Sequence, residues 1–137
     1  MLNRRAILIC LTASAASPAA LPAAAQGQAF PFDAVWIAES LGEKRFAPVS
    51  RPTLRIARSL QIAGSTGCNR FMGGPAAIEG ARLTIPPLAT TKMMCFGAGG
   101  DNERMFLPAI ASTSGWRFER RMLVLETAQG PLRFRRR

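Results

Sequence analysis

The chain has 137 residues, a formal net charge of +10 at neutral pH, three cysteines and no histidine. Without histidine it lacks the imidazole that Ser-His and Cys-His nucleophile systems and most zinc sites require, so these classes are excluded. Its length supports one small domain with a modest core.

The first 25 residues have the features of a cleavable export signal. Arg4 and Arg5 precede an apolar run over residues 6–11, and an alanine-rich stretch ends at Ala25. This order of basic, apolar and small residues is typical of a signal peptide. We therefore expect residues 1–25 to be removed and the mature protein to be periplasmic.

Two other forms of membrane attachment fit the sequence less well. Pro18 and Pro22, among many weakly apolar alanines, disfavour an uncleaved spanning helix. Cys10 follows bulky apolar residues, whereas a lipoprotein needs small residues before its modified cysteine. We expect no outer-membrane lipoprotein and no stable membrane span after cleavage, with residues 26–33 as a linker and 34–137 as the domain.

The basic charge indicates anionic partners. Without Arg4 and Arg5 the formal charge falls from +10 to +8. Because an exported protein does not ordinarily meet nucleic acid, the candidate partners are anionic lipid headgroups, lipopolysaccharide phosphates and acidic polymers of the envelope. A basic surface that only keeps a small domain soluble is the simpler alternative. The arginine-rich tail at residues 133–137 has the same two interpretations.

From Trp36 onward, apolar and polar residues alternate with the period of a β-strand. Hairpins are predicted at residues 53–64, 76–85 and 116–125. A last strand follows the turn at 129–131. This series predicts an antiparallel meander with one solvent-facing side.

One helix interrupts the strands. Asp101 is a good N-cap residue, and Phe106, Leu107 and Ile110 then fall near one stripe. Pro108 cannot donate the backbone hydrogen bond that a helix interior requires, so we expect a short or kinked helix.

Two short motifs lie in the middle of the chain. Residues 64–73 read GSTGCNRFMG and residues 90–95 read TTKMMC, with 83–85 between them and 103–106 after them. This ordered set resembles the META domain of HslJ-like bacterial envelope proteins, and the similarity covers nearly the whole mature chain. Each motif alone is weak evidence, but the set in this order is fairly specific.

The resemblance implies a small α+β fold, in which one helix packs against a curved antiparallel sheet that approaches an open barrel. It also implies an envelope protein linked to stress or antibiotic tolerance, without an established reaction. Met94 and Pro75 depart from the family pattern, so any cleft near them is shaped differently here. The motif and turn residues that match are Gly67, Asn69, Phe71, Gly73, Thr91 and Met93.

Cys68 and Cys95, one in each motif, are the main candidate site. In an oxidising compartment two thiols favour a disulfide, which would stabilise a small domain by roughly 3 to 4 kcal/mol. A structural zinc site normally needs four ligands, and a redox switch usually has a Cys-x-x-Cys arrangement, so both are disfavoured. We expect no metal and no cofactor.

Polar residues beside the cysteines have two interpretations each. Asn69 is a turn residue between glycines, which we favour, or a polar group presented to a ligand. Arg70 and Lys92 are candidate anion contacts if the disulfide holds their segments together; otherwise they are two solvated charges. Since neither paired carboxylates nor a supported Ser/Lys pair is evident, we expect no catalysis.

The sequence therefore predicts a monomeric, non-catalytic binding or structural module of the periplasm. One alternative is an inhibitor or accessory module of another envelope protein. Another is a lipid- or amphiphile-binding half-barrel, which needs an apolar cavity between helix and sheet. Filling of the interior by the large aromatic residues would argue against that cavity; these residues are Trp36, Phe106, Trp116 and Phe118.

Overall fold

A computed structural model describes residues 13–18 and 28–137. The rest of the predicted signal peptide and the first linker residues lie outside the described residues. Residues 13–18 form no regular secondary structure. In the described ranges no helix is long and apolar enough to cross a membrane.

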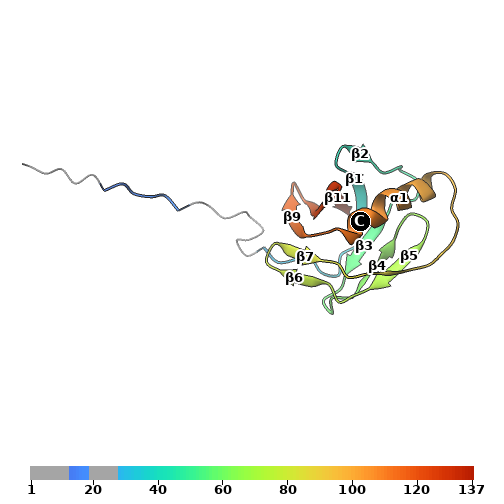
Figure 1. Cartoon of the computed structure of the whole chain (residues 1–137), viewed down its shortest axis with the longest axis horizontal. Helices are drawn as coiled ribbons and strands as arrows, with labels where there is room; N and C mark the ends of the chain where they lie inside the picture. Colours follow the sequence, from blue (N-terminus) through green and yellow to red (C-terminus); the bar gives the residue numbers. More distant parts are fainter. Residues whose placement is uncertain (1–12, 19–27) are drawn as a thin grey trace, which may run out of the picture.

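Residues 28–137 form one α+β domain with a single helix and eleven strands (Figure 1). The three predicted hairpins and the predicted last strand are all present. In chain order the elements are β1 Trp36–Leu41, β2 Lys44–Arg45, β3 Thr53–Ile56, β4 Ile62–Ser65, β5 Arg70–Gly73, β6 Ala77–Glu79, β7 Arg82–Thr84, β8 Ala89–Thr90, α1 Ala98–Ala111, β9 Gly115–Glu119, β10 Met122–Thr127 and β11 Gly130–Arg136.

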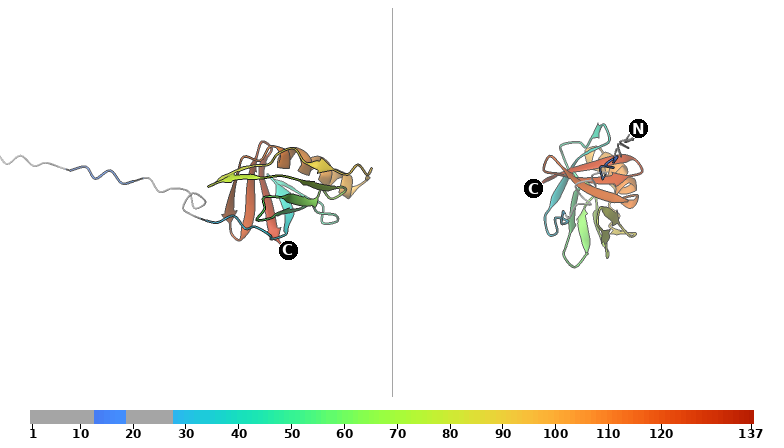
Figure 2. Two further views of the ribbon diagram at one scale, coloured as in Figure 1. Left: turned by 90° about the horizontal axis from the view of Figure 1, so that it is seen from below. Right: turned by 90° about the vertical axis from the view of Figure 1, so that its left-hand side faces the viewer.

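The sheet is antiparallel and curls into a half-barrel with α1 packed against it (Figure 2). Its strand order is β6-β7-β9-β10-β11-β1-β3-β4-β5-β8, and β2 pairs with β1. The last strand therefore pairs with the first, where Trp36 lies opposite Arg136 on one side and Leu54 of β3 on the other. This pairing joins two series of hairpins into one sheet, which no local sequence pattern predicts.

Large aromatic side chains fill the interior. Trp36, Phe106 and Trp116 are 3%, 0% and 2% exposed, and the half-buried Phe118 contacts both tryptophans. Phe30, in the segment predicted as a linker, is also buried and meets Trp116 edge to face at 5.2 Å. At α1, Phe106 contacts three further aromatic rings, so aromatic side chains occupy the space beneath the helix that an enclosed amphiphile cavity would need; these rings are Phe46, Phe71 and Phe134.

The helix differs from the sequence-based prediction at its start. Gly97, not Asp101, is the N-cap residue, and Asp101 lies in the first turn. Gly97 has φ 69°, a left-handed conformation that glycine adopts without steric cost. The helix has 14 residues and continues past Pro108 to Ala111, so it is not short. Burial of Ala109 and Ile110, after the proline, stabilises this last turn.

Candidate functional site

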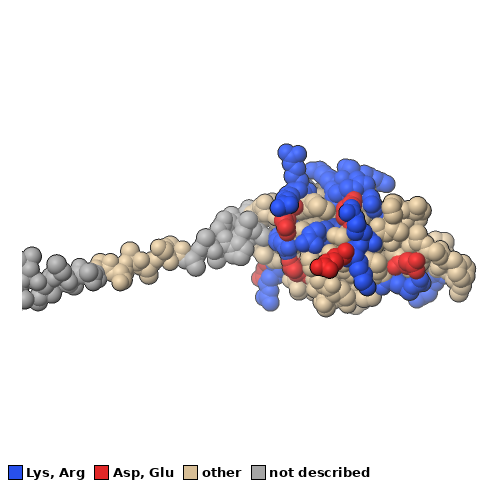
Figure 3. Space-filling view, turned by 90° about the horizontal axis from the view of Figure 1, so that it is seen from above, with Lys and Arg blue, Asp and Glu red and all other residues tan. Residues whose placement is uncertain are grey.

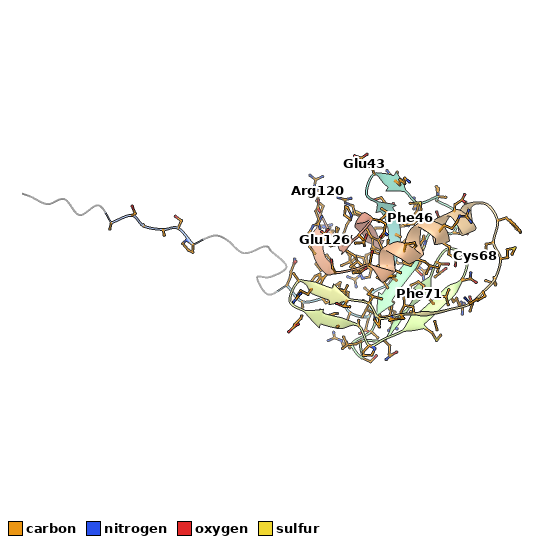
Figure 4. The ribbon with its side chains drawn as sticks, viewed as in Figure 1. Glu43, Phe46, Cys68, Phe71, Arg120 and Glu126 are labelled. Atoms are coloured by element: carbon orange, nitrogen blue, oxygen red, sulfur yellow. A yellow bond between two sulfur atoms is a disulfide. The ribbon has the colours of Figure 1, made fainter. Side chains whose placement is uncertain are left out.

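The two cysteine motifs meet at one end of the domain. The sulfurs of Cys68 and Cys95 lie at disulfide distance, and their Cα atoms are 5.8 Å apart. This pair joins the turn between β4 and β5 to the loop between β8 and α1 (Figure 4). The predicted pairing of the two segments is therefore present in the structure.

Asn69 connects the same two segments through its side chain. Asn69 is 3% exposed, so its side-chain amide is not presented to solvent. Its backbone φ is not positive, so the residue does not adopt a left-handed turn conformation. Its Oδ1 accepts hydrogen bonds from the Met93 backbone N–H (2.6 Å) and the Thr91 hydroxyl (2.9 Å). Its Nδ2 donates to the Met93 carbonyl at 3.1 Å. The amide thus makes the backbone hydrogen bonds to Met93 that a neighbouring strand would otherwise make, at the start of the loop formed by residues 91–97.

Glu103 of α1 completes this buried network. Its Oε1 accepts hydrogen bonds from Asn69 Nδ2 at 2.9 Å and from the Thr66 hydroxyl at 2.7 Å. The Thr66 oxygen in turn accepts the backbone N–H groups of Cys68 and Asn69. The Glu103 carboxylate therefore fixes the turn between β4 and β5 against the helix.

Asn102, the next residue towards the helix start, anchors α1 to a different loop. It is 1% exposed, and its amide bonds both the N–H and the carbonyl of Ala47 and the carbonyls of Val49 and Ser50. Sequence reasoning missed Thr66, Asn102 and Glu103 as structural residues. Thr66 and Glu103 lie inside the segments that resemble the META domain, which was the one sequence feature that could have indicated their role. Asn102 lies outside these segments, so no sequence feature indicated its role.

The remaining motif residues have structural positions. Gly67 has φ 97° in the turn, and Gly73 pairs with Ile62 in the sheet. Phe71 is 2% exposed and packs on Phe106 with ring centroids 5.6 Å apart. Phe71 and the two glycines therefore serve the fold rather than a ligand.

The loop after the network carries exposed apolar side chains. Met93, Met94 and Phe96 are 60%, 82% and 86% exposed, although the Met93 backbone is held by Asn69. These side chains belong to residues 93–96 of the segment that connects β8 to α1, which we call the 93–96 loop. Three large apolar side chains within four residues form an unusual surface for a water-exposed loop.

The two candidate anion contacts lie near each other along the backbone but do not share one hollow. Arg70 and Thr91 exchange two hydrogen bonds, from Arg70 N–H to Thr91 Oγ1 and from Thr91 N–H to the Arg70 carbonyl. Lys92 lines an open hollow of about 490 Å³ beside α1, together with Glu103 and Arg104. Arg70 is not part of that lining.

A second, apolar hollow of about 350 Å³ adjoins the first along α1. Thr90 and Leu107 line both hollows. The other residues of the apolar hollow are Ile85, Pro86, Pro87, Leu88, Ile110 and Ala111. Over residues 13–18 and 28–137, no group of three or more Cys, Asp or Glu side chains is arranged to hold a metal ion.

Comparisons with known proteins agree with this architecture. A solved structure described as "NMR structure of the protein from Burkholderia xenovorans" is 26% identical, with a TM-score of 0.64, covering 96% of this chain and 99% of the other. A second, "NMR structure of the protein", is 23% identical with a TM-score of 0.60, covering 84% and 95%. No curated protein matches the chain. The META domain family model matches residues 30–137, and the chain therefore belongs to the META domain family.

Proposed function

We propose that this chain is an exported, non-catalytic binding module of the bacterial envelope, and that the 93–96 loop is its binding surface. One observation carries the proposal: a buried hydrogen-bond network fixes the backbone at the start of a loop whose apolar side chains point into solvent. The signal features at residues 1–25 support export. The association with envelope stress or antibiotic tolerance, which the family resemblance suggests, belongs to the same proposal.

A loop that only connected β8 to α1 would not need this arrangement. Exposing Met94 and Phe96 to water has a free-energy cost, since burial of each side chain would release roughly 1.5 to 3 kcal/mol. Anchoring by Asn69 and Glu103 reduces the loop motion that a partner would have to freeze on binding. Such a preorganised apolar tip favours association with another molecule.

Photo-crosslinking in living cells tests the proposal. A photoreactive residue at Met94 should give adducts with a defined envelope component. The matched control is Arg120, which is exposed in the β9–β10 turn at the opposite end of the domain from Cys68 (Figure 4). Adducts at position 94 but not at 120 support the binding surface, and their mass identifies a lipid or a protein. Equal labelling at both positions, or none at 94, contradicts it.

The two adjoining hollows favour a second candidate function, the binding of a single amphiphile along α1. An anionic head beside Lys92 would place a short apolar chain over Leu107 and Leu88. This surface groove differs from the enclosed cavity that the half-barrel alternative requires. Ala111→Phe, which fills the apolar hollow, should abolish binding of a fluorescent fatty acid, whereas Ala128→Phe, at an exposed turn, should not.

A further inference from the structure

We propose that the outer face of β1 and β11 holds a binding site for phosphate groups, built on Glu39 and the arginines around it. The site is separate from the 93–96 loop, so it goes beyond the function proposed above. We call Glu39, Arg45, Arg51 and Arg135 the Glu39 cluster.

One carboxylate in this cluster meets three guanidinium groups from different parts of the chain. Glu39 Oε1 lies 2.5 Å from Arg135 Nε of β11 and 3.5 Å from Arg51 Nη1 of the loop before β3. Arg45 Nη2 of β2 lies 3.8 Å from Glu39 Oε2. The Glu39 side chain is 14% exposed, and Arg51 is 22% exposed. The convergence depends on the pairing of β1 with both β2 and β11.

The charges of this surface do not balance. An open hollow of about 530 Å³ is lined by Glu39, Arg45 and Arg135 of the cluster and also by Glu43 and Arg133. Arg133 makes no ion pair within residues 28–137. Three arginines and two carboxylates therefore line the hollow, and Arg51, which contacts Glu39 from outside this lining, raises the excess to two positive charges. Figure 3 shows Lys and Arg side chains gathered around a few carboxylates on the side where β2 lies in Figure 1.

The chemistry of the cluster fits a phosphate group. Guanidinium groups bind phosphate oxygens through paired N–H donors, and Arg is preferred where this geometry matters. Glu39 holds three of the arginines in position, so less side-chain freedom is lost when an anion arrives. The donors left for an anion are those of Arg133, which lines the hollow without an ion pair in the described ranges, and the N–H groups of Arg45 and Arg135 that do not face Glu39.

Inorganic pyrophosphate is the probe that tests the site. The mature chain is titrated with it at physiological salt, and binding is followed by calorimetry and by the NMR signals of the arginine Nε–H groups. Arg133→Gln should weaken binding by about tenfold, the loss typical of one charge-assisted contact. Because Arg133 has no ion pair in the described residues, this variant should fold normally.

Arg70→Gln and Arg82→Gln are matched controls, since both residues are exposed, neither lines the hollow, and each substitution removes the same charge elsewhere on the surface. Both should bind pyrophosphate within about twofold of the unchanged protein, because exposed charges farther than 8 to 10 Å are screened. Equal losses in all three variants would mean a diffuse basic coat and overturn the proposal. Absence of pyrophosphate binding to the unchanged protein at physiological salt, or binding unaffected by Arg133→Gln, would also overturn it.

Vesicles distinguish the two sources of phosphate once pyrophosphate binding that depends on Arg133 is established. Vesicles containing phosphatidic acid present the phosphate as a lipid headgroup, and vesicles of zwitterionic lipid alone do not. If the protein is retained on phosphatidic-acid vesicles and Arg133→Gln abolishes this retention, the site binds lipid headgroups. If the protein is not retained on these vesicles, the site binds soluble phosphate compounds. Crosslinking at Met94 in the Arg133→Gln variant shows whether the 93–96 loop still binds, so either proposal can fail alone.

Discussion

Asn69 Nδ2 donates a hydrogen bond of 2.9 Å to Glu103 Oε1, and this contact joins the turn before β5 to the first half of α1. The amide is 3% exposed, and its Oδ1 is used by Met93 and Thr91. Every polar atom of the side chain therefore has a partner from another segment. The end of the domain that carries the cysteines depends on this network as well as on the sulfur atoms.

We expect Asn69→Ala to lower the free energy of unfolding by about 3 kcal/mol, because it leaves the Met93 backbone and the Glu103 carboxylate without buried partners. Denaturant unfolding measures this loss. Asn69→Asp keeps the acceptors but places two carboxylates together, so its stability should recover as pH falls and one carboxyl becomes protonated. A cost below 0.5 kcal/mol for Asn69→Ala would contradict the role of the network.

The disulfide is the second test. Cys68 and Cys95 are 27 residues apart in sequence, and loss of the bond should cost about 3 to 4 kcal/mol. Cys68→Ser and Cys95→Ser break the same bond, so the double variant should be no less stable than either single variant. Alkylation followed by intact-mass analysis of periplasmic material checks that the bond forms. Two free thiols there would rule it out.

The third test separates packing from exposure among the phenylalanines. Phe106 is fully buried and contacts the rings of Phe46, Phe71 and Phe134, so Phe106→Ala should cost roughly 3 to 5 kcal/mol by leaving a cavity. Phe96→Ala is the matched control: its side chain is 86% exposed, and the change should stay within about 0.5 kcal/mol. Similar costs for both would mean that the 93–96 loop is packed rather than free to bind.

The hairpins were predictable because their apolar residues alternate locally. Leu54 and Ile56 face Gly64 and Ile62 across one turn, so the period of two in the sequence is enough to place both strands. The pairing of Trp36 with Arg136 joins strands 100 residues apart and leaves no local signal. Long-range order of this kind follows from burying both strands in one core, which a single alternating pattern cannot specify.

The candidate site was predictable only in part, for a similar reason. The disulfide between the cysteines could be predicted from their residue type and from the oxidising compartment that the export signal predicts. Asn69 lies in the turn between β4 and β5, but its hydrogen bonds to Met93 and Glu103 could not be predicted, because both partners are distant in sequence. Glu39 is one of eight acidic residues spread along the sequence, and the β1–β11 pairing brings Arg135 into contact with it. In both cases the polar residue gains its partners from tertiary pairing.

The last prediction concerns Gly100, in the first turn of α1. By helix propensity alone, Gly100→Ala should stabilise an exposed helix by about 1 kcal/mol. Gly100 is buried, however, and a Cβ added there would overlap the carbonyl oxygen of Cys95. A Cβ added at the neighbouring Gly99 would lie 2.8 Å from the carbonyl oxygen of Gly67. We therefore expect Gly100→Ala to destabilise the domain by about 1 to 3 kcal/mol, because backbone must shift to admit the methyl group.

Thermal and denaturant unfolding check the sign of this change. Arg104→Ala serves as the control, since it introduces alanine at an exposed position of the same helix and should alter stability by no more than about 0.5 kcal/mol. If Gly100→Ala stabilises the protein, helix propensity outweighs the contact, and α1 does not press against the disulfide loop as closely as the structure indicates. If it destabilises as expected, Gly100 is required for the close approach of α1 to the Cys95 segment, at the end of the helix where Glu103 meets Asn69.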